Sequence, residues 1–187
     1  KSSAASDVYK RQGAEAASAG INPAIMREAV VIQMTWPGSP TVYYGDEAGV
    51  CGFTDPDNRR TYPWGKEDQE MLDFHKRMIC IHKAYPILAK GSLEFLWNDH
   101  QGLSYGRFSD SEQIIVILNN QDQERDIRVT AWKTGVSRKE ATVFQRLMLS
   151  SGEGYTEMPE EYIADAGILQ VLSLIHISEP TRHAQIS

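Results

Sequence analysis

Four carboxylates lie close together in the sequence, within the stretch Pro37–Trp64: Asp46, Glu47, Asp55 and Asp57. Paired carboxylates can hydrolyse a glycosidic bond, because one attacks the sugar as a nucleophile while the other donates a proton to the leaving group. Asp46 and Glu47 are adjacent, so on an extended strand their side chains would point to opposite faces and would not act as a pair. The alternative is that both acids brace the loop by accepting hydrogen bonds from backbone N–H groups.

The stretch Asp55–Arg60, with the sequence DPDNRR, combines a rigid proline, acids and guanidinium groups in one loop. Sugar hydroxyls are bound by charged and amide groups in a fixed geometry, while aromatic faces stack on the sugar ring. The loop therefore predicts a sugar-binding surface. The alternative is an Asp–Arg pair that only fixes the loop. The nearby aromatic residues are Tyr43, Tyr62 and Trp64.

Other chemistries lack their signatures. His75 and His82 fall seven positions apart on a predicted helix, and His100 lies in a predicted turn. Without a cluster of Cys and His residues we expect no zinc site. The sequence contains neither a glycine-rich phosphate loop nor the turn that presents a nucleophilic serine.

The bulk properties exclude several classes of protein. The 187 residues carry a formal charge of −6, are 41% hydrophobic and include two cysteines. Two cysteines do not make a disulfide framework, and no apolar run is long enough to span a membrane. The acidic balance disfavours nucleic acid as a partner. With no visible signal peptide, we expect a cytoplasmic protein.

The acids of this stretch follow a short predicted strand that is flanked by helices. The four residues Thr41–Tyr44 are β-branched or aromatic, which is typical of a buried strand. A largely buried helix is predicted over Ala24–Trp36, with Asn22 and Pro23 in the positions that favour a helix start. A second helix is predicted over Glu67–Ala84. A strand that ends in an acidic loop between helices is typical of an α/β barrel, where such loops build the active site.

From Gly91 onward the pattern changes to short strands separated by turns. Such a series without intervening helices predicts an antiparallel β-sandwich, and we interpret Glu153–Asp165 as a loop. The change of pattern near residues 88–92 predicts a boundary between two architectures. The strands are predicted around Leu93–Trp97, Leu103–Tyr105, Ile114–Leu118, Ile127–Ala131 and Ala141–Met148.

The two ends of the chain look foreign. Asp7–Gln12 can be encoded by GATGTGTATAAGAGACAG, whose reverse complement translates as LSLIHI, the sequence of Leu172–Ile177. The surrounding strings SSAASDVYKRQ and LSLIHISEPTR resemble translated transposase adapters from sequencing libraries. We therefore exclude residues 1–12 and 172–187 from fold prediction and expect the remainder to be a fragment. The alternative is a genuine strand at Ser173–Ile177.

Two motifs carry a family resemblance. PGSPTVYYGDEAG followed by GFTDPDNRRTYPW resembles the eighth strand and the following loop of the α-amylase family of glycoside hydrolases. Within it, DPDNRR followed by a tryptophan is similar to the neopullulanase, cyclomaltodextrinase and maltogenic amylase branch. The resemblance covers nearly all of residues 13–171 and is strongest over Trp36–Trp64.

The resemblance implies the fold and the activity. Residues 13–90 would be the last part of a (β/α)₈ barrel and residues 91–171 a C-terminal antiparallel β-sandwich, an α/β plus all-β chain. The family hydrolyses α-1,4 and sometimes α-1,6 glucosidic bonds with retention. Its three catalytic acids come from the fourth, fifth and seventh strands, which would precede residue 13. The resemblance therefore implies no catalytic residue in this chain, which we expect to be inactive by itself.

The resemblance also implies which residues of this chain contact the substrate. In this branch the first Asp and the first Arg of the loop motif bind glucose units, and they fall on Asp55 and Arg59. A Cys commonly precedes that Arg in the branch, whereas Asn58 stands here. The implied partner is an α-glucan, with neither nucleic acid nor membrane; we expect no cofactor, although the parent protein could bind calcium and form a homodimer.

A non-catalytic module is the alternative function. The predicted sandwich could be a carbohydrate-binding or purely structural unit. Trp97 and Trp132 would stack on sugar if exposed, but aromatic residues at strand spacing more often belong to a core.

Overall fold

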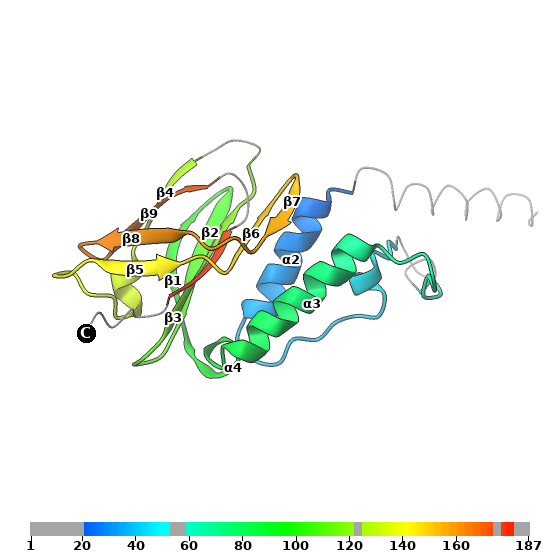
Figure 1. Cartoon of the computed structure of the whole chain (residues 1–187), viewed down its shortest axis with the longest axis horizontal. Coiled ribbons are helices and arrows are strands. Elements are labelled where there is room, and N and C mark those ends of the chain that lie inside the picture. The colour runs from blue at the N-terminus through cyan, green and yellow to red at the C-terminus, as the bar shows by residue number, and fades with distance from the viewer. Residues whose placement is uncertain (1–20, 53–58, 122–124, 174–176, 182–187) are drawn as a thin grey trace, which may run out of the picture.

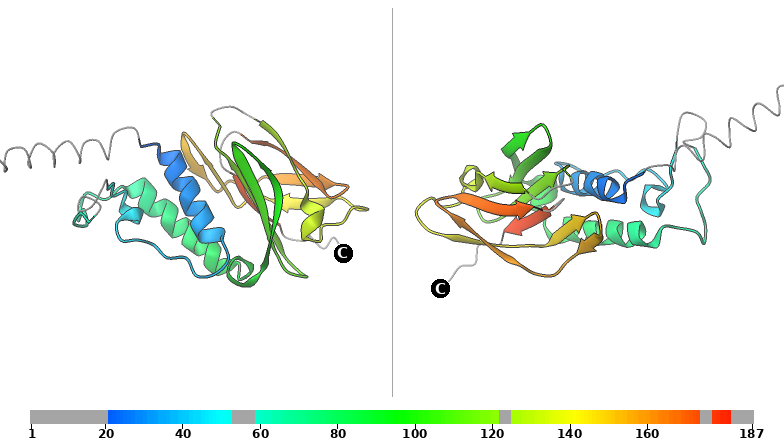
Figure 2. Two further views of the ribbon diagram at one scale, coloured as in Figure 1. Left: turned by 180° about the vertical axis from the view of Figure 1, so that it is seen from behind. Right: turned by 90° about the horizontal axis from the view of Figure 1, so that it is seen from above.

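The computed structural model describes residues 21–52, 59–121, 125–173 and 177–181. Two helices lie side by side against a sandwich of two antiparallel sheets, with a short third helix at the junction (Figures 1 and 2). In the described part of the chain, every helix is too short or too polar to cross a bilayer.

Helix α2 spans Pro23–Thr35 and begins as the sequence predicts. The side chain of Asn22 accepts a hydrogen bond of 2.9 Å from the Ala24 N–H, and Pro23 occupies the first helical position. At the other end, the Trp36 N–H donates to the Ile32 carbonyl before Pro37 stops the helix. The expectation that this helix is largely buried is wrong, because Ile25 and Met26 are exposed.

Helix α3 spans Gln69–Ala84 and begins two residues after the predicted start. The reason is local: the Asp68 carboxylate accepts a hydrogen bond of 3.0 Å from the Met71 N–H and caps the helix there. The predicted apolar face is confirmed, since Met71, Phe74 and Met78 are buried. The short helix α4, Ile87–Lys90, follows Pro86.

The predicted strand over Thr41–Tyr44 is wrong. These residues have no strand partner among the described residues, and Val42, Tyr43 and Tyr44 are exposed. A strand of a barrel is held by hydrogen bonds to neighbours on both sides, and high β propensity does not replace them. The segment instead leads into η1, a turn of 3₁₀-helix at Asp46–Ala48.

The predicted antiparallel sandwich is confirmed, and its two sheets have the strand orders β1-β2-β3-β10-β6-β7 and β4-β9-β8-β5. The strands of the six-stranded sheet are β1 (Ser92–Asp99), β2 (Gly102–Phe108), β3 (Gln113–Asn119), β6 (Met148–Ser151), β7 (Gly154–Thr156) and β10 (Ile177–Thr181). Those of the four-stranded sheet are β4 (Arg125–Val129), β5 (Thr142–Gln145), β8 (Glu161–Asp165) and β9 (Ile168–Ser173).

Three details of the sandwich differ from the sequence prediction. The predicted loop Glu153–Asp165 contains β7 and β8, because their backbones pair with β6 and with β5 and β9. Ala131 ends the alternating run in the 3₁₀-helix η2, Ala131–Thr134, instead of extending β4. The single strand predicted over Ala141–Met148 is divided into β5 and the start of β6.

The segment 172–187, which we excluded from fold prediction, is partly in strands. Leu172 and Ser173 end β9, and residues 177–181 form β10 between β3 and β6. Most of the alternative strand over Ser173–Ile177 lies outside the described residues, so this alternative stays untested. The foreign origin of the segment stays a prediction, because backbone pairing does not reveal where a sequence comes from.

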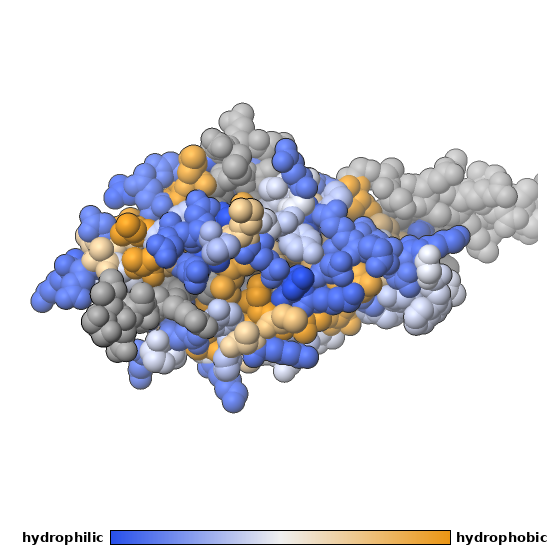
Figure 3. Space-filling view, in the orientation of Figure 1, coloured by the Kyte–Doolittle hydropathy of each residue, from blue (hydrophilic) through white to orange (hydrophobic). Residues whose placement is uncertain are grey.

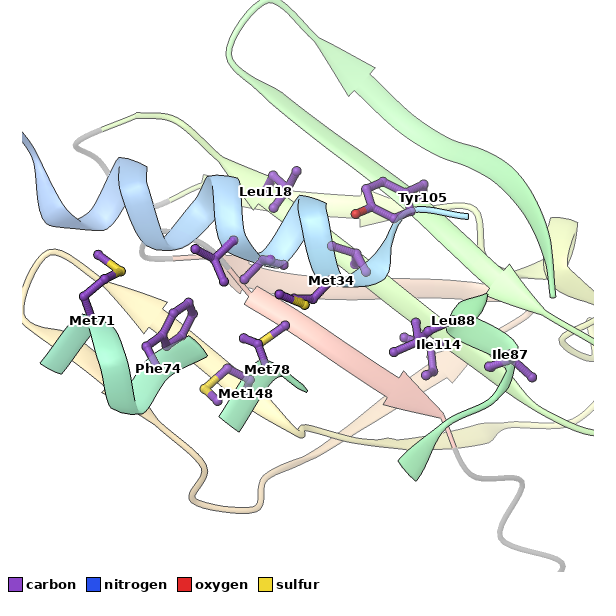
Figure 4. Packing of buried hydrophobic residues seen from close by; sticks show 13 residues of the cluster. Met34, Met71, Phe74, Met78, Ile87, Leu88, Tyr105, Ile114, Leu118 and Met148 are labelled. Carbon is purple, nitrogen blue, oxygen red and sulfur yellow. The ribbon is translucent and has the colours of Figure 1, made fainter. Parts of the chain in front are cut away.

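Two hydrophobic clusters cover opposite faces of the six-stranded sheet. Ile115 and Ile117 of β3 belong to the cluster between the two sheets. The intervening residues of β3 belong to the cluster with α2, α3 and α4, in which Met34 and Met78 lie against each other (Figure 4). All seven residues of β3 are buried, which explains why its apolar run does not alternate with polar residues.

A buried arginine joins the helices to the sandwich. Arg107 on β2 is fully buried and donates hydrogen bonds to the carbonyl oxygens of Thr35, at 2.8 Å, Leu88 and Gly91, at 2.7 Å. These carbonyls lie at the ends of α2 and α4, where a helix has no internal donors for them. Burial lowers the pKa of the Arg107 guanidinium from its ordinary value. Beside it, the hydroxyls of Tyr105 and Thr35 are 2.5 Å apart.

A second buried arginine holds the start of α2. The guanidinium of Arg27 donates to the Ser150 hydroxyl at 3.0 Å and to the Ser151 carbonyl at 2.6 Å, both on β6. It also forms an ion pair of 2.8 Å with Glu70 on α3. One side chain therefore connects α2, α3 and the sandwich.

We predict that Arg107→Leu lowers the free energy of unfolding by about 3 kcal/mol or more, because it leaves several buried carbonyls without a donor. Urea unfolding followed by circular dichroism measures this loss. Arg128→Leu is the matched control, since Arg128 is exposed on β4 and its loss should change little. Equal stability of the two variants would contradict the role assigned to Arg107.

Candidate functional site

Two glycines shape the turn at the start of the candidate site. Gly45 and Gly49 flank η1 with φ angles of 89° and 70°, in the left-handed region that other residues rarely adopt. A Cβ atom on Gly45 would lie 2.9 Å from Val50 Cγ2, and one on Gly49 would lie 2.9 Å from Asp68 Cβ. Both positions therefore require glycine for conformation and for space.

Backbone hydrogen bonds close the base of the loop that follows. The Val50 N–H donates to the Gly45 carbonyl at 2.9 Å, and the Asp68 N–H donates to the Ala48 carbonyl at 3.1 Å. Because Asp68 also caps α3, the end of the loop is fixed to a helix that packs in the core. The loop between Gly49 and Asp68 thus has a rigid base.

Glu47 braces the turn, as the non-catalytic alternative proposed. Its Oε2 accepts a hydrogen bond of 3.0 Å from the backbone N–H of Gly45. This contact holds the carboxylate against its own turn. The described geometry gives Glu47 a structural role.

Asp46 points to a small cavity between α2 and α3. The cavity measures about 150 Å³ and also contains His75, which is buried. Burial raises the pKa of the Asp46 carboxyl, and the nearby His75 opposes this shift. The apolar and amide residues around the cavity are Met26, Ala29, Val30, Gln33 and Met71.

Sequence reasoning missed the position of His75. Its Nδ1 lies 3.0 Å from the Met71 carbonyl one turn earlier, which accepts a hydrogen bond from the ring, and its Nε2 is buried without a hydrogen-bond partner. The available signal was its place beside Phe74 on the buried side of α3. Helical spacing alone does not say which neighbour a polar side chain meets.

Four aromatic residues gather along the turn and the loop, and three of them, Tyr43, Tyr44 and Trp64, are exposed. The rings of Tyr62 and Trp64 are 4.5 Å apart, and Trp64 is 82% exposed. Tyr43 and Tyr44 form a second pair at 4.8 Å, and the Tyr44 hydroxyl donates to the Arg60 carbonyl at 2.9 Å. The last contact joins the two sides of the loop. The surface in Figure 3 is mixed, with apolar residues in patches between hydrophilic ones.

Arg59 lies on the exposed side of this loop, near Tyr44. Partial burial raises the pKa of the Tyr44 phenol, and the positive charge of Arg59 opposes that shift. Asp55, the other predicted substrate contact, lies outside the described residues, as does Asp57. The structure therefore places one of the two predicted binding residues beside aromatic rings and does not test the pair.

The described residues can hold a sugar but do not assemble a catalytic centre. Exposed rings and a guanidinium can stack on a sugar and donate to its hydroxyls. Among the described residues, no group of three His, Cys, Asp or Glu side chains could bind a metal ion. Glu47 is committed to its turn, and Asp46 faces the helices.

The tryptophans of the sandwich are partly covered by arginines. The Arg138 guanidinium lies 3.8 Å from the centre of the Trp132 ring, and that of Arg125 lies 5.2 Å from Trp97. Each ring thus has a cation over one face, which is the surface that a sugar would need. The alternative of a sugar-binding sandwich gains no support from these two residues.

Comparison with known proteins gives consistent relatives. No protein-family model matches the chain. It is 32% identical over 163 residues to an amylopullulanase from Thermoanaerobacter thermohydrosulfuricus, covering 80% of this chain and 10% of that protein. It is 34% identical over 122 residues to neopullulanase 2 from Thermoactinomyces vulgaris, covering 63% of this chain and 21% of that protein. The chain thus spans only a tenth to a fifth of these relatives.

Solved structures share the fold. An α-amylase from Geobacillus thermoleovorans superposes with a TM-score of 0.69 at 19% identity, over 88% of this chain and 34% of that one. A debranching enzyme from Nostoc punctiforme gives 0.62 at 23% identity, over 85% and 31%. At these identities the likeness establishes the fold alone, the end of a barrel followed by a β-sandwich.

We predict that Asp46→Asn raises the free energy of unfolding near neutral pH. The pKa of Asp46 in the folded chain lies above its ordinary value of 3.8, so ionising this group opposes folding. In the wild-type chain, the contribution of Asp46 to the free energy of unfolding is fully present below pH 3.8, where the carboxyl is protonated. This contribution is lost as the pH rises through the raised pKa of the folded chain. The advantage of the variant should therefore disappear in acid.

Urea unfolding between about pH 7 and pH 3 tests this expectation. Asp165→Asn, at an exposed position of β8, is the control and should show no such pH dependence. A variant that is less stable than wild type at neutral pH, or equally altered at every pH, would disprove it.

Proposed function

Because this chain belongs to the α-amylase family of glycoside hydrolases, in the neopullulanase, cyclomaltodextrinase and maltogenic amylase branch, we propose that it is part of a retaining α-glucan hydrolase. In this proposal it contributes the last part of the barrel and the C-terminal sandwich. Similarity over 163 residues, which includes the candidate loop, is the observation that carries the proposal.

The proposed substrates are maltooligosaccharides, cyclodextrins, pullulan or starch, cleaved at α-1,4 and in some cases α-1,6 glucosidic bonds. Relatives named amylopullulanase, neopullulanase and cyclomaltodextrinase support this range. The chemistry of the loop agrees with a neutral sugar, because exposed rings offer stacking surfaces without demanding a charged ligand. Calcium binding, a homodimer and a cytoplasmic location stay predictions.

We assign substrate positioning to Arg59, with Asp55 as its predicted companion. An exposed guanidinium offers several donors in a fixed plane, which suits the oxygens of adjacent sugar hydroxyls. The rigid base of the loop would hold this group in one place relative to the barrel. The three catalytic acids are proposed to lie in other parts of the longer protein.

We predict that Arg59→Ala, made in the longer protein, lowers kcat/KM on cyclodextrin or pullulan by about tenfold to a hundredfold, the loss of one charged hydrogen-bonding contact. Steady-state kinetics with each substrate measures the change. Arg128→Ala, which removes an exposed arginine from the sandwich, is the matched control. Kinetics of Arg59→Ala equal to those of wild type would refute the assignment.

We also predict that the 187-residue chain hydrolyses none of these glucans, because the residues proposed to do the chemistry are absent from it. Release of reducing ends from maltooligosaccharides and pullulan provides the assay, with the longer protein as the positive control. Hydrolysis by the purified chain would contradict the proposal that the catalytic acids lie elsewhere.

A further inference from the structure

Of the large hydrophobic residues that the structure describes, Trp64 is the most exposed, with 82% of its surface open to solvent. The sandwich residue Trp132 is only 37% exposed, and the Arg138 guanidinium lies over its ring. A single exposed apolar residue is common on protein surfaces, so exposure alone does not identify a binding site. What distinguishes Trp64 is the set of contacts that hold it in place.

The backbone that carries the Trp64 indole forms a tight turn. The Trp64 N–H donates to the Tyr62 carbonyl at 3.0 Å, and the Lys66 N–H donates to the Pro63 carbonyl at 2.8 Å. Pro63 has a fixed φ angle, which stiffens the turn further. Two residues after Lys66, Asp68 caps α3. The turn is therefore ordered by its own hydrogen bonds and ends at a helix that packs in the core.

The Tyr62 ring supports the indole from one side. The two ring centres are 4.5 Å apart, and the ring planes are inclined by 49°. Partial burial raises the pKa of the Tyr62 phenol, and the negative charges of Glu47 and Glu67 and a hydrogen bond to Glu47 raise it further. Glu47 also accepts the hydrogen bond from the Gly45 N–H at 3.0 Å. A series of contacts thus runs from the η1 turn through Glu47 and Tyr62 to Trp64.

A supported but open indole has the properties of a stacking surface for a sugar ring. Its flat apolar face carries a negative partial charge, and the C–H groups on one side of a glucose ring are apolar and slightly positive. Because the turn and the Tyr62 ring already hold the indole, binding would cost little conformational entropy. Trp64 follows Arg59 by five residues in the same loop, so one substrate could meet both side chains.

We propose that Trp64 is a binding platform that stacks on one glucose unit of the α-glucan, and that Tyr62 and Glu47 are positioning residues that hold its indole in place. This inference rests on the proposed function. Stacking on a glucose unit away from the cleaved bond acts equally in the ground state and the transition state, so it appears in KM and leaves kcat unchanged. The platform thereby favours glucans long enough to reach it.

The test uses the longer protein and a series of maltooligosaccharides of increasing length. Trp64→Ala should raise KM by about tenfold on the longest members and leave KM unchanged on the shortest, with kcat unchanged throughout. Trp64→Phe keeps a stacking ring and should recover most of the loss. Trp132→Ala, which removes a tryptophan whose ring is covered by Arg138, is the matched control and should leave KM unchanged.

The positioning role is tested by Tyr62→Phe, which keeps the ring contact with Trp64 and removes the hydroxyl that Glu47 holds. We expect a KM about threefold higher on the long substrates, with the same dependence on length. Kinetics of Tyr62→Phe equal to those of wild type would overturn the role assigned to Tyr62 and Glu47.

Urea unfolding separates binding from packing. Because Trp64 is exposed, Trp64→Ala should leave the urea midpoint unchanged. An unchanged KM on long substrates would overturn the proposal, and a lower urea midpoint in the same variant would show that Trp64 packs against another part of the longer protein. If the wild-type longer protein hydrolyses no α-glucan, the proposed function fails, and this inference fails with it; if only the Trp64 variants match wild type, the proposed function stands.

Discussion

The structure depends on one cation buried where the helices meet the sandwich. Arg107 comes from the second strand of the sandwich and satisfies carbonyls at the ends of α2 and α4. A helix C-terminus carries partial negative charge, and its last carbonyl groups have no hydrogen-bond donor within the helix. A guanidinium placed there supplies both a positive charge and the missing donors. Few other side chains could reach carbonyls from several segments at once, since five donors in one plane are particular to arginine.

This junction also determines where the candidate loop lies. Arg107 holds the end of α2, and Arg27 holds its beginning together with α3. The turn at Asp46–Ala48 is attached to α3 through the Asp68 N–H, so the loop has a base defined by both helices. The sandwich therefore fixes, through packing and hydrogen bonds, the helices to which the loop is attached.

Local signals in the sequence were sufficient for the elements that local interactions stabilise. Asn22 caps α2 through a contact two residues away, as predicted, and the apolar face of α3 follows from spacing alone. The start of α3 was predicted two residues too early, because the sequence prediction did not identify Asp68 as the cap. The predicted strand at Thr41–Tyr44 failed because a strand needs partners that propensity does not supply. Strands β7 and β8 were predicted as a loop because their residues have little intrinsic preference for strands. They are strands because their backbones pair with neighbouring strands.

In the candidate site, too, local contacts could be predicted from the sequence and contacts between distant segments could not. The bracing role of Glu47 could be foreseen because it involves the adjacent turn. Asp46 and His75 line the same cavity although they come from separate elements, so no local sequence pattern predicts their proximity. The proposed binding role of Arg59 came from the family resemblance, and the structure adds its place near the exposed pair Tyr43 and Tyr44.

The most direct test of the account is a crystal structure of the longer protein with a bound maltooligosaccharide. The account predicts a guanidinium nitrogen of Arg59 within about 3 Å of a sugar hydroxyl, with the loop forming one wall of the occupied cleft. A sugar bound in the cleft while Arg59 faces open solvent or lies buried away from it would contradict the account.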